Sequence, residues 1–141
     1  NGEYFLADAI NLMLEQGASF RTHQTEVWLD AGIPEALLET NKYLLDHGAG
    51  NHFTPEFMEG VTIVPPVFIA PGAHLEGSVI GPHVTLGEGC TISSSIIRNS
   101  IIGAGTQISD IVLESSLIGR DVNLIGRSEK LNIGDNSWME M

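Results

Sequence analysis

The stretch SVIGPHVTLGEGCTISSSIIRNSIIGAGTQISDIVLESSLIG, Ser78 to Gly119, decides the fold, because its aliphatic residues return at every fifth or sixth position. A helix has a period of 3.6 residues and does not give this spacing, and a plain strand alternation needs no reset after five or six residues. The same period continues toward both ends of the chain. Its members are Ile63, Ile69, Leu75, Ile80, Leu86, Ile92, Ile97, Ile102, Ile108, Leu113, Ile118 and Leu124.

Repeats of this length predict a solenoid of short strands joined by tight bends, with the aliphatic series pointing inward. Each coil buries its apolar residue only against its neighbours, and glycines that follow the aliphatic residues relieve the backbone at the bends. A second series of small or β-branched residues comes four positions after most members of the first. It comprises Val67, Ala73, Val79, Val84, Cys90, Ile96, Ile101, Thr106, Val112, Leu117 and Val122.

The first 47 residues have a different pattern, which is rich in helix signals. We predict a helix that is N-capped by Asp8 and ends at Gly17, and a second helix that begins at Pro34 and ends at Gly48. Residues 18–23 and 26–29 are predicted to be extended. Two helices and two short strands make a poor core, so we expect the front half of this α/β unit to lie outside the chain.

Residues 48–60 show neither a helical nor an alternating period and are predicted to be a linker. The expected domain organisation is therefore an α/β remnant over 1–47, a linker over 48–60, and a β-helix with a C-terminal cap over 61–141. Trp138 is assigned to packing in that cap or to a contact between subunits.

Composition excludes several classes of function. Among the 141 residues, 18 acidic side chains face 6 basic ones, for a net charge of −12, which argues against nucleic acid and anionic membranes as partners. A single cysteine cannot form an internal disulfide and fits a reducing compartment, so we expect a cytoplasmic location. No apolar run approaches the length of a membrane span.

Most isolated polar residues have ordinary structural interpretations. His74 and His83 fall outside the inward positions and are predicted to face solvent without a partner. Cys90 takes a small inward position and is interpreted as an inert core residue. The glycines around Ala104 keep the phase of the repeat and are followed by neither a helix nor a lysine, so they do not predict a phosphate loop.

The most specific constellation is Trp28-Leu29-Asp30-Ala31-Gly32, which lies between a predicted strand and the second helix. A carboxylate at the C-terminal end of a strand is placed where α/β proteins hold ligands and metals, and Asp30 could supply an oxygen ligand to Mg²⁺. The same residue could equally serve a turn or a helix cap. The pattern alone leaves both interpretations open.

This motif, the preceding Gly2-Glu3-Tyr4-Phe5-Leu6-Ala7-Asp8, and the repeats together resemble the C-terminal part of sugar-1-phosphate nucleotidyltransferases. The similarity is to glucose-1-phosphate thymidylyltransferase-like enzymes of the long form. It implies that the repeats form a hexapeptide-repeat, left-handed parallel β-helix with three inward positions per coil and about four coils. The fold class is then mainly β, with a short α/β segment in front.

The resemblance also implies a chemistry for the parent enzyme. Such enzymes join a sugar-1-phosphate to a nucleoside triphosphate, here dTTP, and release pyrophosphate with the help of Mg²⁺. It implies that Asp30 is a metal ligand and that Glu3 lies beside the sugar pocket. The family's Gly-rich loop with its basic residues is absent from these 141 residues, so we assign no catalytic residue here and expect the chain alone to be inactive.

Two other functions remain open at this point. The first is an acyltransferase that uses acetyl-CoA, with His74 or His83 as general base. The second is a module that serves only trimerisation. In the preferred interpretation the β-helix supports structure and assembly, and the molecule is a homo-oligomer.

Overall fold

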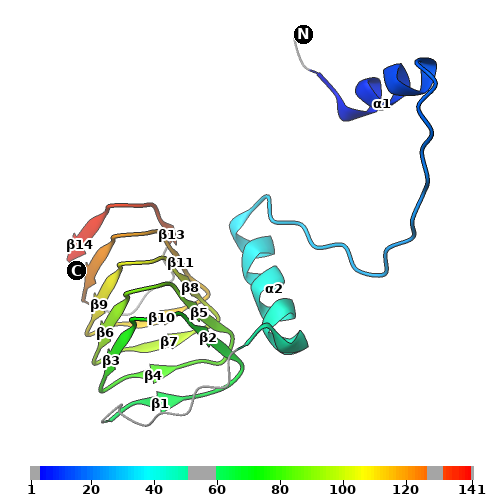
Figure 1. Cartoon of the computed structure of the whole chain (residues 1–141). Helices are drawn as coiled ribbons and strands as arrows, with labels where there is room; N and C mark the ends of the chain where they lie inside the picture. Colours follow the sequence, from blue (N-terminus) through cyan, green and yellow to red (C-terminus); the bar gives the residue numbers. More distant parts are fainter. Residues whose placement is uncertain (1–3, 51–59, 127–131, 141) are drawn as a thin grey trace.

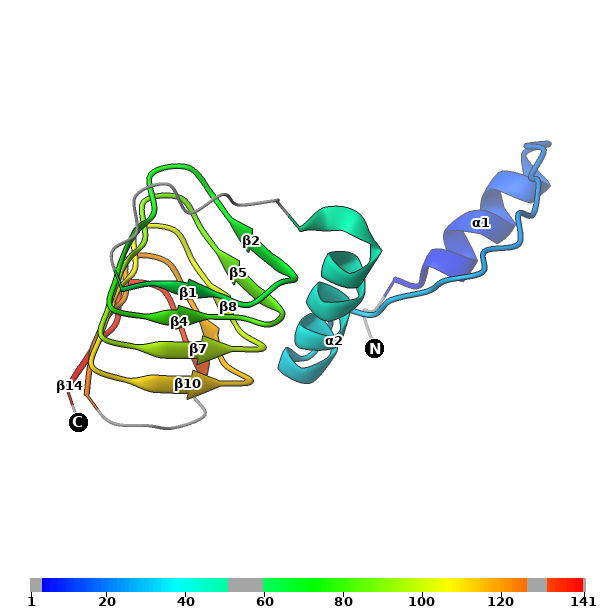
Figure 2. The ribbon, with the colours of Figure 1, turned by 90° about the horizontal axis from the view of Figure 1, so that it is seen from below.

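The computed structural model describes residues 4–50, 60–126 and 132–140, and its central element is a three-sided parallel β-solenoid of about four turns. Figures 1 and 2 show three sheets wrapped around one core, with helix α2 beside one corner and helix α1 at the far end of an extended segment. Within the described residues, no helix has the length and apolar character needed to cross a bilayer.

Each sheet takes at most one strand from a coil, so strands that are neighbours in a sheet are never consecutive in the chain. Sheet A has the order β1-β4-β7-β10, sheet B β13-β11-β8-β5-β2, and sheet C β14-β12-β9-β6-β3. The strands are β1 Thr62–Ile63, β2 Val67–Ile69, β3 His74–Glu76, β4 Val79–Ile80, β5 Val84–Leu86, β6 Thr91–Ser93, β7 Ile96–Arg98, β8 Ile101–Ile102, β9 Gln107–Ser109, β10 Val112–Glu114, β11 Leu117–Ile118, β12 Asn123–Ile125, β13 Asn132–Ile133 and β14 Trp138–Glu140.

The aliphatic series predicted to point inward lines the core in register. Ile63, Ile80, Ile97 and Leu113 stack in sheet A. Ile69, Leu86, Ile102 and Ile118 stack in sheet B, and Leu75, Ile92, Ile108 and Leu124 stack in sheet C. All twelve belong to the core cluster or pack against it, so the geometric prediction is confirmed.

The second series divides according to the length of the step. Six-residue steps place its members two positions before the next inward residue, and Val84, Cys90 and Thr106 are buried. Five-residue steps place its members one position before that residue, on the opposite side of the strand. These members therefore lie on the outer faces of sheets A and B, where they pair with one another across neighbouring strands. They are Val79, Ile96, Ile101, Val112 and Leu117.

In the five-residue steps, the buried position two residues before the inward one is a serine in four cases and Ile111 in the fifth. Ser78, Ser95, Ser100 and Ser116 are each no more than 2% exposed. Ser95 Oγ donates to the Ser93 carbonyl at 2.6 Å and accepts the Ile111 amide of the next coil at 3.2 Å. Because the hydroxyl both donates and accepts, it is satisfied inside the core and links successive coils.

Three of the glycines that follow aliphatic residues, Gly87, Gly103 and Gly119, are required because the backbone of the next coil lies close to them. At Gly103 an added Cβ would lie 2.4 Å from the Gly119 carbonyl oxygen of the next coil, and at Gly87 it would lie 2.5 Å from the Ala104 amide nitrogen. Close stacking of coils therefore excludes a side chain there. Gly81, which follows Ile80, does have a positive φ of 106°, as the predicted relief of bending requires. Other positive φ angles form columns at the corners, as in Gly72, Gly89, Gly105, Asp121 and Asn136.

The second of the two predicted helices begins at the predicted residue, and the first begins earlier than predicted. Helix α2 spans Pro34–Leu44 with Pro34 in its first turn, and it continues as a wide helical turn, η1 Leu45–Ala49, in which Gly48 has a φ of +94°. Helix α1 spans Leu6–Glu15, and its N-cap residue is Phe5, not Asp8, which lies inside the first turn. Asp8 can still interact favourably with the helix dipole from that position.

Residues 18–23 and 26–29 form no strand, contrary to the prediction. A strand needs a neighbour for its backbone hydrogen bonds, and Figure 1 shows this segment extending away from the solenoid. The side chains of Val27, Trp28 and Leu29 are all exposed, Trp28 to 86%. Of the predicted linker, residues 51–59 lie outside the described part of the chain.

Candidate functional site

The predicted metal ligand Asp30 lies in the exposed loop that leads into α2. Its Oδ1 accepts the Gly32 amide at 3.0 Å, so the carboxylate closes a local turn. Its backbone carbonyl accepts the Thr40 hydroxyl at 3.0 Å, which ties the loop to the helix that follows. The turn interpretation and the ligand interpretation are compatible, because an ionised carboxylate has lone pairs beyond the one that Gly32 uses.

Mg²⁺ is commonly bound by one or two carboxylates together with waters and substrate phosphates. Asp30 fits the part of one such carboxylate, since it is exposed and its loop geometry is defined. Among the described residues no group of three or more His, Cys, Asp or Glu side chains could hold a metal ion. Any complete centre that includes Asp30 therefore needs further ligands. The other predicted site residue, Glu3, lies outside the described residues.

Helix α2 is held against the solenoid by apolar and polar contacts. Leu38 and Leu45 are buried, while Leu37 and Leu44 are exposed. Asn41 accepts the Thr85 hydroxyl at its Oδ1 at 2.6 Å. Its Nδ2 donates to the His83 carbonyl at 3.3 Å.

His83 has a partner, which corrects the prediction that it faces solvent alone. Its Nε2 lies 2.7 Å from Oδ1 of Asp46, which follows α2 in the turn η1. The His83 side chain is 18% exposed. Sequence reasoning missed this pair because the two residues are 37 positions apart and no repeat relates them. His74, by contrast, is exposed on sheet C as predicted.

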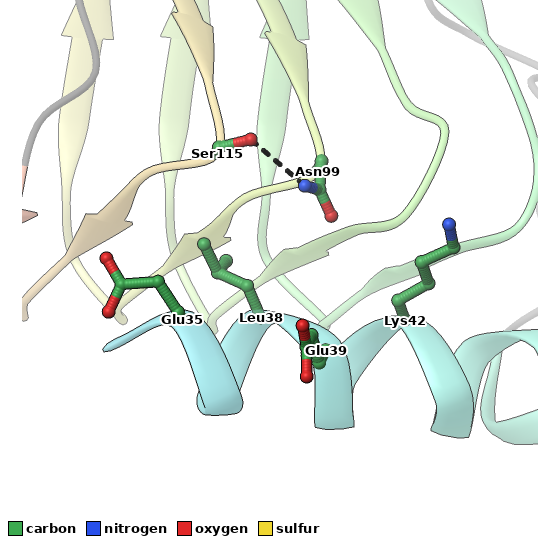
Figure 3. Close-up of a pocket in the computed structure, with 6 residues that line it drawn as sticks. All are labelled: Glu35, Leu38, Glu39, Lys42, Asn99 and Ser115. Atoms are coloured by element: carbon green, nitrogen blue, oxygen red, sulfur yellow. Dashed lines mark hydrogen bonds between the residues drawn. The ribbon is translucent and has the colours of Figure 1, made fainter. Parts of the chain in front are cut away.

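A pocket of about 280 Å³ opens between α2 and the corner that joins sheets A and B. Figure 3 shows Glu35, Leu38, Glu39 and Lys42 on the helix side, and Asn99 with Ser115 on the solenoid side. Asn99 Nδ2 donates to Ser115 Oγ at 3.0 Å, which links two successive coils at the rim. The lining has charges of both signs, so it does not form a basic cradle for a triphosphate.

Cys90 is buried, and its Sγ donates to the Gly103 carbonyl at 3.1 Å. Burial raises the pKa of the Cys90 thiol above its usual value, and hydrogen bonds from the Thr106 and Gly87 backbone oppose that shift only in part. The thiol therefore stays protonated near neutral pH, as expected for an unreactive core residue.

Comparison with known proteins tests the resemblance to sugar-1-phosphate nucleotidyltransferases. No family model matches the chain. It is 28% identical over 159 residues to a glucose-1-phosphate thymidylyltransferase of Streptomyces griseus, which covers 96% of this chain and 45% of that protein. It is 28% identical to the bifunctional protein GlmU of Bacillus velezensis, over 87% of this chain and 29% of that protein.

A third relative is the low-salt glycan biosynthesis nucleotidyltransferase Agl11 of Haloferax volcanii, with 28% identity over 99% of this chain and 46% of that protein. The chain thus spans less than half the length of the curated relatives it matches. The matches fall in the C-terminal part of those proteins, and the structure has the parallel β-solenoid expected of a β-helix tail. The homologues of this chain are therefore nucleotidyltransferases, which confirms the resemblance to sugar-1-phosphate nucleotidyltransferases that carry a β-helix.

Proposed function

We propose that this chain is the C-terminal part of a sugar-1-phosphate nucleotidyltransferase in which Asp30 supplies one ligand to Mg²⁺ and the solenoid supports structure and assembly. The observation that carries the proposal is the position of Asp30, in a defined turn immediately before a helix that packs on the solenoid. The name of the Streptomyces griseus relative, a glucose-1-phosphate thymidylyltransferase, favours dTTP and glucose-1-phosphate as substrates. We place Glu3 beside the sugar, and the whole enzyme in the cytoplasm.

The chemistry assigned to this chain is limited to binding and orientation. Mg²⁺, when bound, would neutralise charge on the transferring phosphate. The Asp30 carboxylate would hold that ion, and the Gly32 amide and the Thr40 hydroxyl would keep the carboxylate and its backbone in place. No catalytic residue is assigned within these 141 residues, and the chain alone should release no pyrophosphate from dTTP and glucose-1-phosphate.

The test uses the longer enzyme that contains this chain. Asp30→Asn should lower kcat by about 100-fold and raise the Mg²⁺ concentration needed for half-maximal activity, because a lost metal ligand removes several kcal/mol of charge stabilisation. Glu26→Gln changes another exposed carboxylate of the same segment and should leave both values within about twofold. An Asp30→Asn enzyme with unchanged Mg²⁺ dependence would contradict the assignment.

A second candidate is acyl transfer from acetyl-CoA, which the likeness to a protein named as bifunctional favours. His74 is the histidine to test, since it is exposed while His83 is engaged with Asp46. Acetyl-CoA binding by this chain that is lost in His74→Ala would support this function.

Homo-oligomerisation is part of our first proposal, and light scattering that shows a monomer across all concentrations would contradict it.

A further inference from the structure

We propose that the solenoid fixes the position of the Asp30 loop through a relay of hydrogen bonds across one turn of α2, with Asn41 and Thr40 as positioning residues. The relay goes beyond the assigned ligand role of Asp30. The effect of the relay on Mg²⁺ binding rests on the proposed function. Its effect on the position of the Asp30 loop does not. It assigns to the solenoid a role in the geometry of the loop in addition to assembly.

The first link joins α2 to sheet B. Both polar atoms of the Asn41 amide are used on one short segment, since Thr85 donates to Oδ1 at 2.6 Å and Nδ2 donates to the His83 carbonyl at 3.3 Å. Because hydrogen bonds prefer a narrow range of distances and angles, two bonds to one amide restrict both the rotation of the helix about its axis and its position along the strand. The pair of Asp46 and His83 adds a third polar contact one turn later.

The second link joins the same turn of α2 to the loop. Thr40 Oγ1 donates to the Asp30 carbonyl at 3.0 Å, and Asp30 Oδ1 in turn accepts the Gly32 amide. Consecutive residues of a helix point about 100° apart around its axis. Thr40 and Asn41 can therefore reach the loop and the solenoid at the same time, on two sides of one helical turn.

Apolar burial holds α2 in place around these polar links. Leu38 and Leu45 are 6% and 4% exposed, and they lie three residues before and four residues after Asn41 on the same helix face. The Asp30 loop has no comparable packing, as the exposed Trp28 and Ile33 on either side show. The position of the loop therefore depends on polar contacts, and a change on the solenoid should reach it through α2.

The first experiment removes the hydrogen bond between the solenoid and α2, and it measures by NMR on this chain how the mobility of α2 and of the Asp30 loop changes. Thr85→Val removes the hydroxyl and keeps the β-branched shape, so the solenoid should still form. We expect amide hydrogen exchange in Leu38–Lys42 to accelerate about fivefold to tenfold, as the loss of one such bond predicts. The order parameters of Ala31 and Gly32 should fall toward about 0.6, the range of flexible backbone.

Controls separate the relay from a general loss of stability. Thr91→Val makes the same change at an outward position of β6 in sheet C, and it should alter neither α2 nor the loop. Thr40→Val should loosen Ala31 and Gly32 and leave exchange in α2 within about twofold. Asn41→Ala removes both bonds of the amide, so it should loosen α2 and the loop at least as much as Thr85→Val. Loosening of α2 without any change at Ala31 and Gly32, or no change at either, would overturn the proposal.

A kinetic arm in the longer enzyme separates failure of the relay from failure of the proposed function. If both hold, Thr85→Val should raise the Mg²⁺ concentration needed for half-maximal activity more than it lowers kcat, and Thr91→Val should change neither. If Asp30 is not a metal ligand, the NMR effects of Thr85→Val remain while the Mg²⁺ dependence is unchanged. If the relay fails, Asp30→Asn still changes the Mg²⁺ dependence and Thr85→Val does not.

Discussion

The solenoid and the segment before α2 use apolar residues in opposite ways. In the solenoid, each inward side chain packs on its equivalents one coil above and below, so the sequence of one coil provides the partner for the next. In residues 4–33, large apolar side chains such as Tyr4, Leu6 and Trp28 are exposed. A repeated pattern thus completes its own core, whereas these apolar side chains of residues 4–33 are not buried by the part of the chain that the structure describes.

The largest expected effect comes from removing a side chain of the shared core. Ile97→Ala should lower the free energy of unfolding by about 3 kcal/mol, because a fully buried side chain is lost and its neighbours in adjacent coils cannot close the space. The matched control is Ile96→Ala, one position away on the outer face of sheet A, which should cost about 1 kcal/mol or less. Urea denaturation measures both, and equal losses would contradict the assigned facing of the strand.

A smaller effect is expected where coils approach most closely. Gly103→Ala should lower the free energy of unfolding by about 2 kcal/mol, because the new Cβ meets the backbone of the next coil, which cannot move aside. The matched control is Gly134→Ala. Gly134 follows the inward aliphatic residue of sheet B in the last coil, and nothing lies within 4 Å of a Cβ added there. That control should stay within about 0.5 kcal/mol in thermal denaturation. A tolerated Gly103→Ala would show that the coils can separate at little cost.

The smallest effect is expected in the segment before α2. Trp28→Ala should change the free energy of unfolding of this chain by less than about 0.5 kcal/mol, because the ring is 86% exposed. Urea denaturation followed by circular dichroism provides the measurement. A loss of the size expected for Ile97→Ala would mean that Trp28 packs on a partner in this chain, and the contrast between the two regions would then be false.

The core could be predicted from the sequence because a spacing of five or six residues leaves few geometric solutions. The second series shows the limit of counting forward from each aliphatic residue, because its members lie inside the core after six-residue steps and outside it after five-residue steps. Ile96 is more hydrophobic than Ser95, yet Ser95 is inside, because strand alternation is set by the inward residue that follows, Ile97. Counting backward from that residue gives the correct face. A buried serine is tolerated because its hydroxyl bonds to the backbone.

The candidate site could be predicted only in part. The motif around Asp30 pointed to a turn before a helix, and the turn is present. The predicted strand before it did not form, since a strand depends on a neighbour that its own residues cannot specify. Asn41 contacts Thr85, and Asp46 contacts His83. Neither the helical period nor the repeat of the solenoid relates these positions. Such contacts depend on where α2 lies in space, which the spacing of residues does not determine.

The corner columns have a consequence for how this molecule can change in length. Each left-handed corner residue stacks on its equivalent 15 to 17 positions away, as in Gly89, Gly105, Asp121 and Asn136. Duplication of one such interval would insert a complete rung and move the end of the rod by about 4.8 Å, with every other rung unchanged. Insertion of a single residue in a strand would reverse the facing of all residues up to the next corner. Growth in whole rungs is therefore the change that this architecture accommodates.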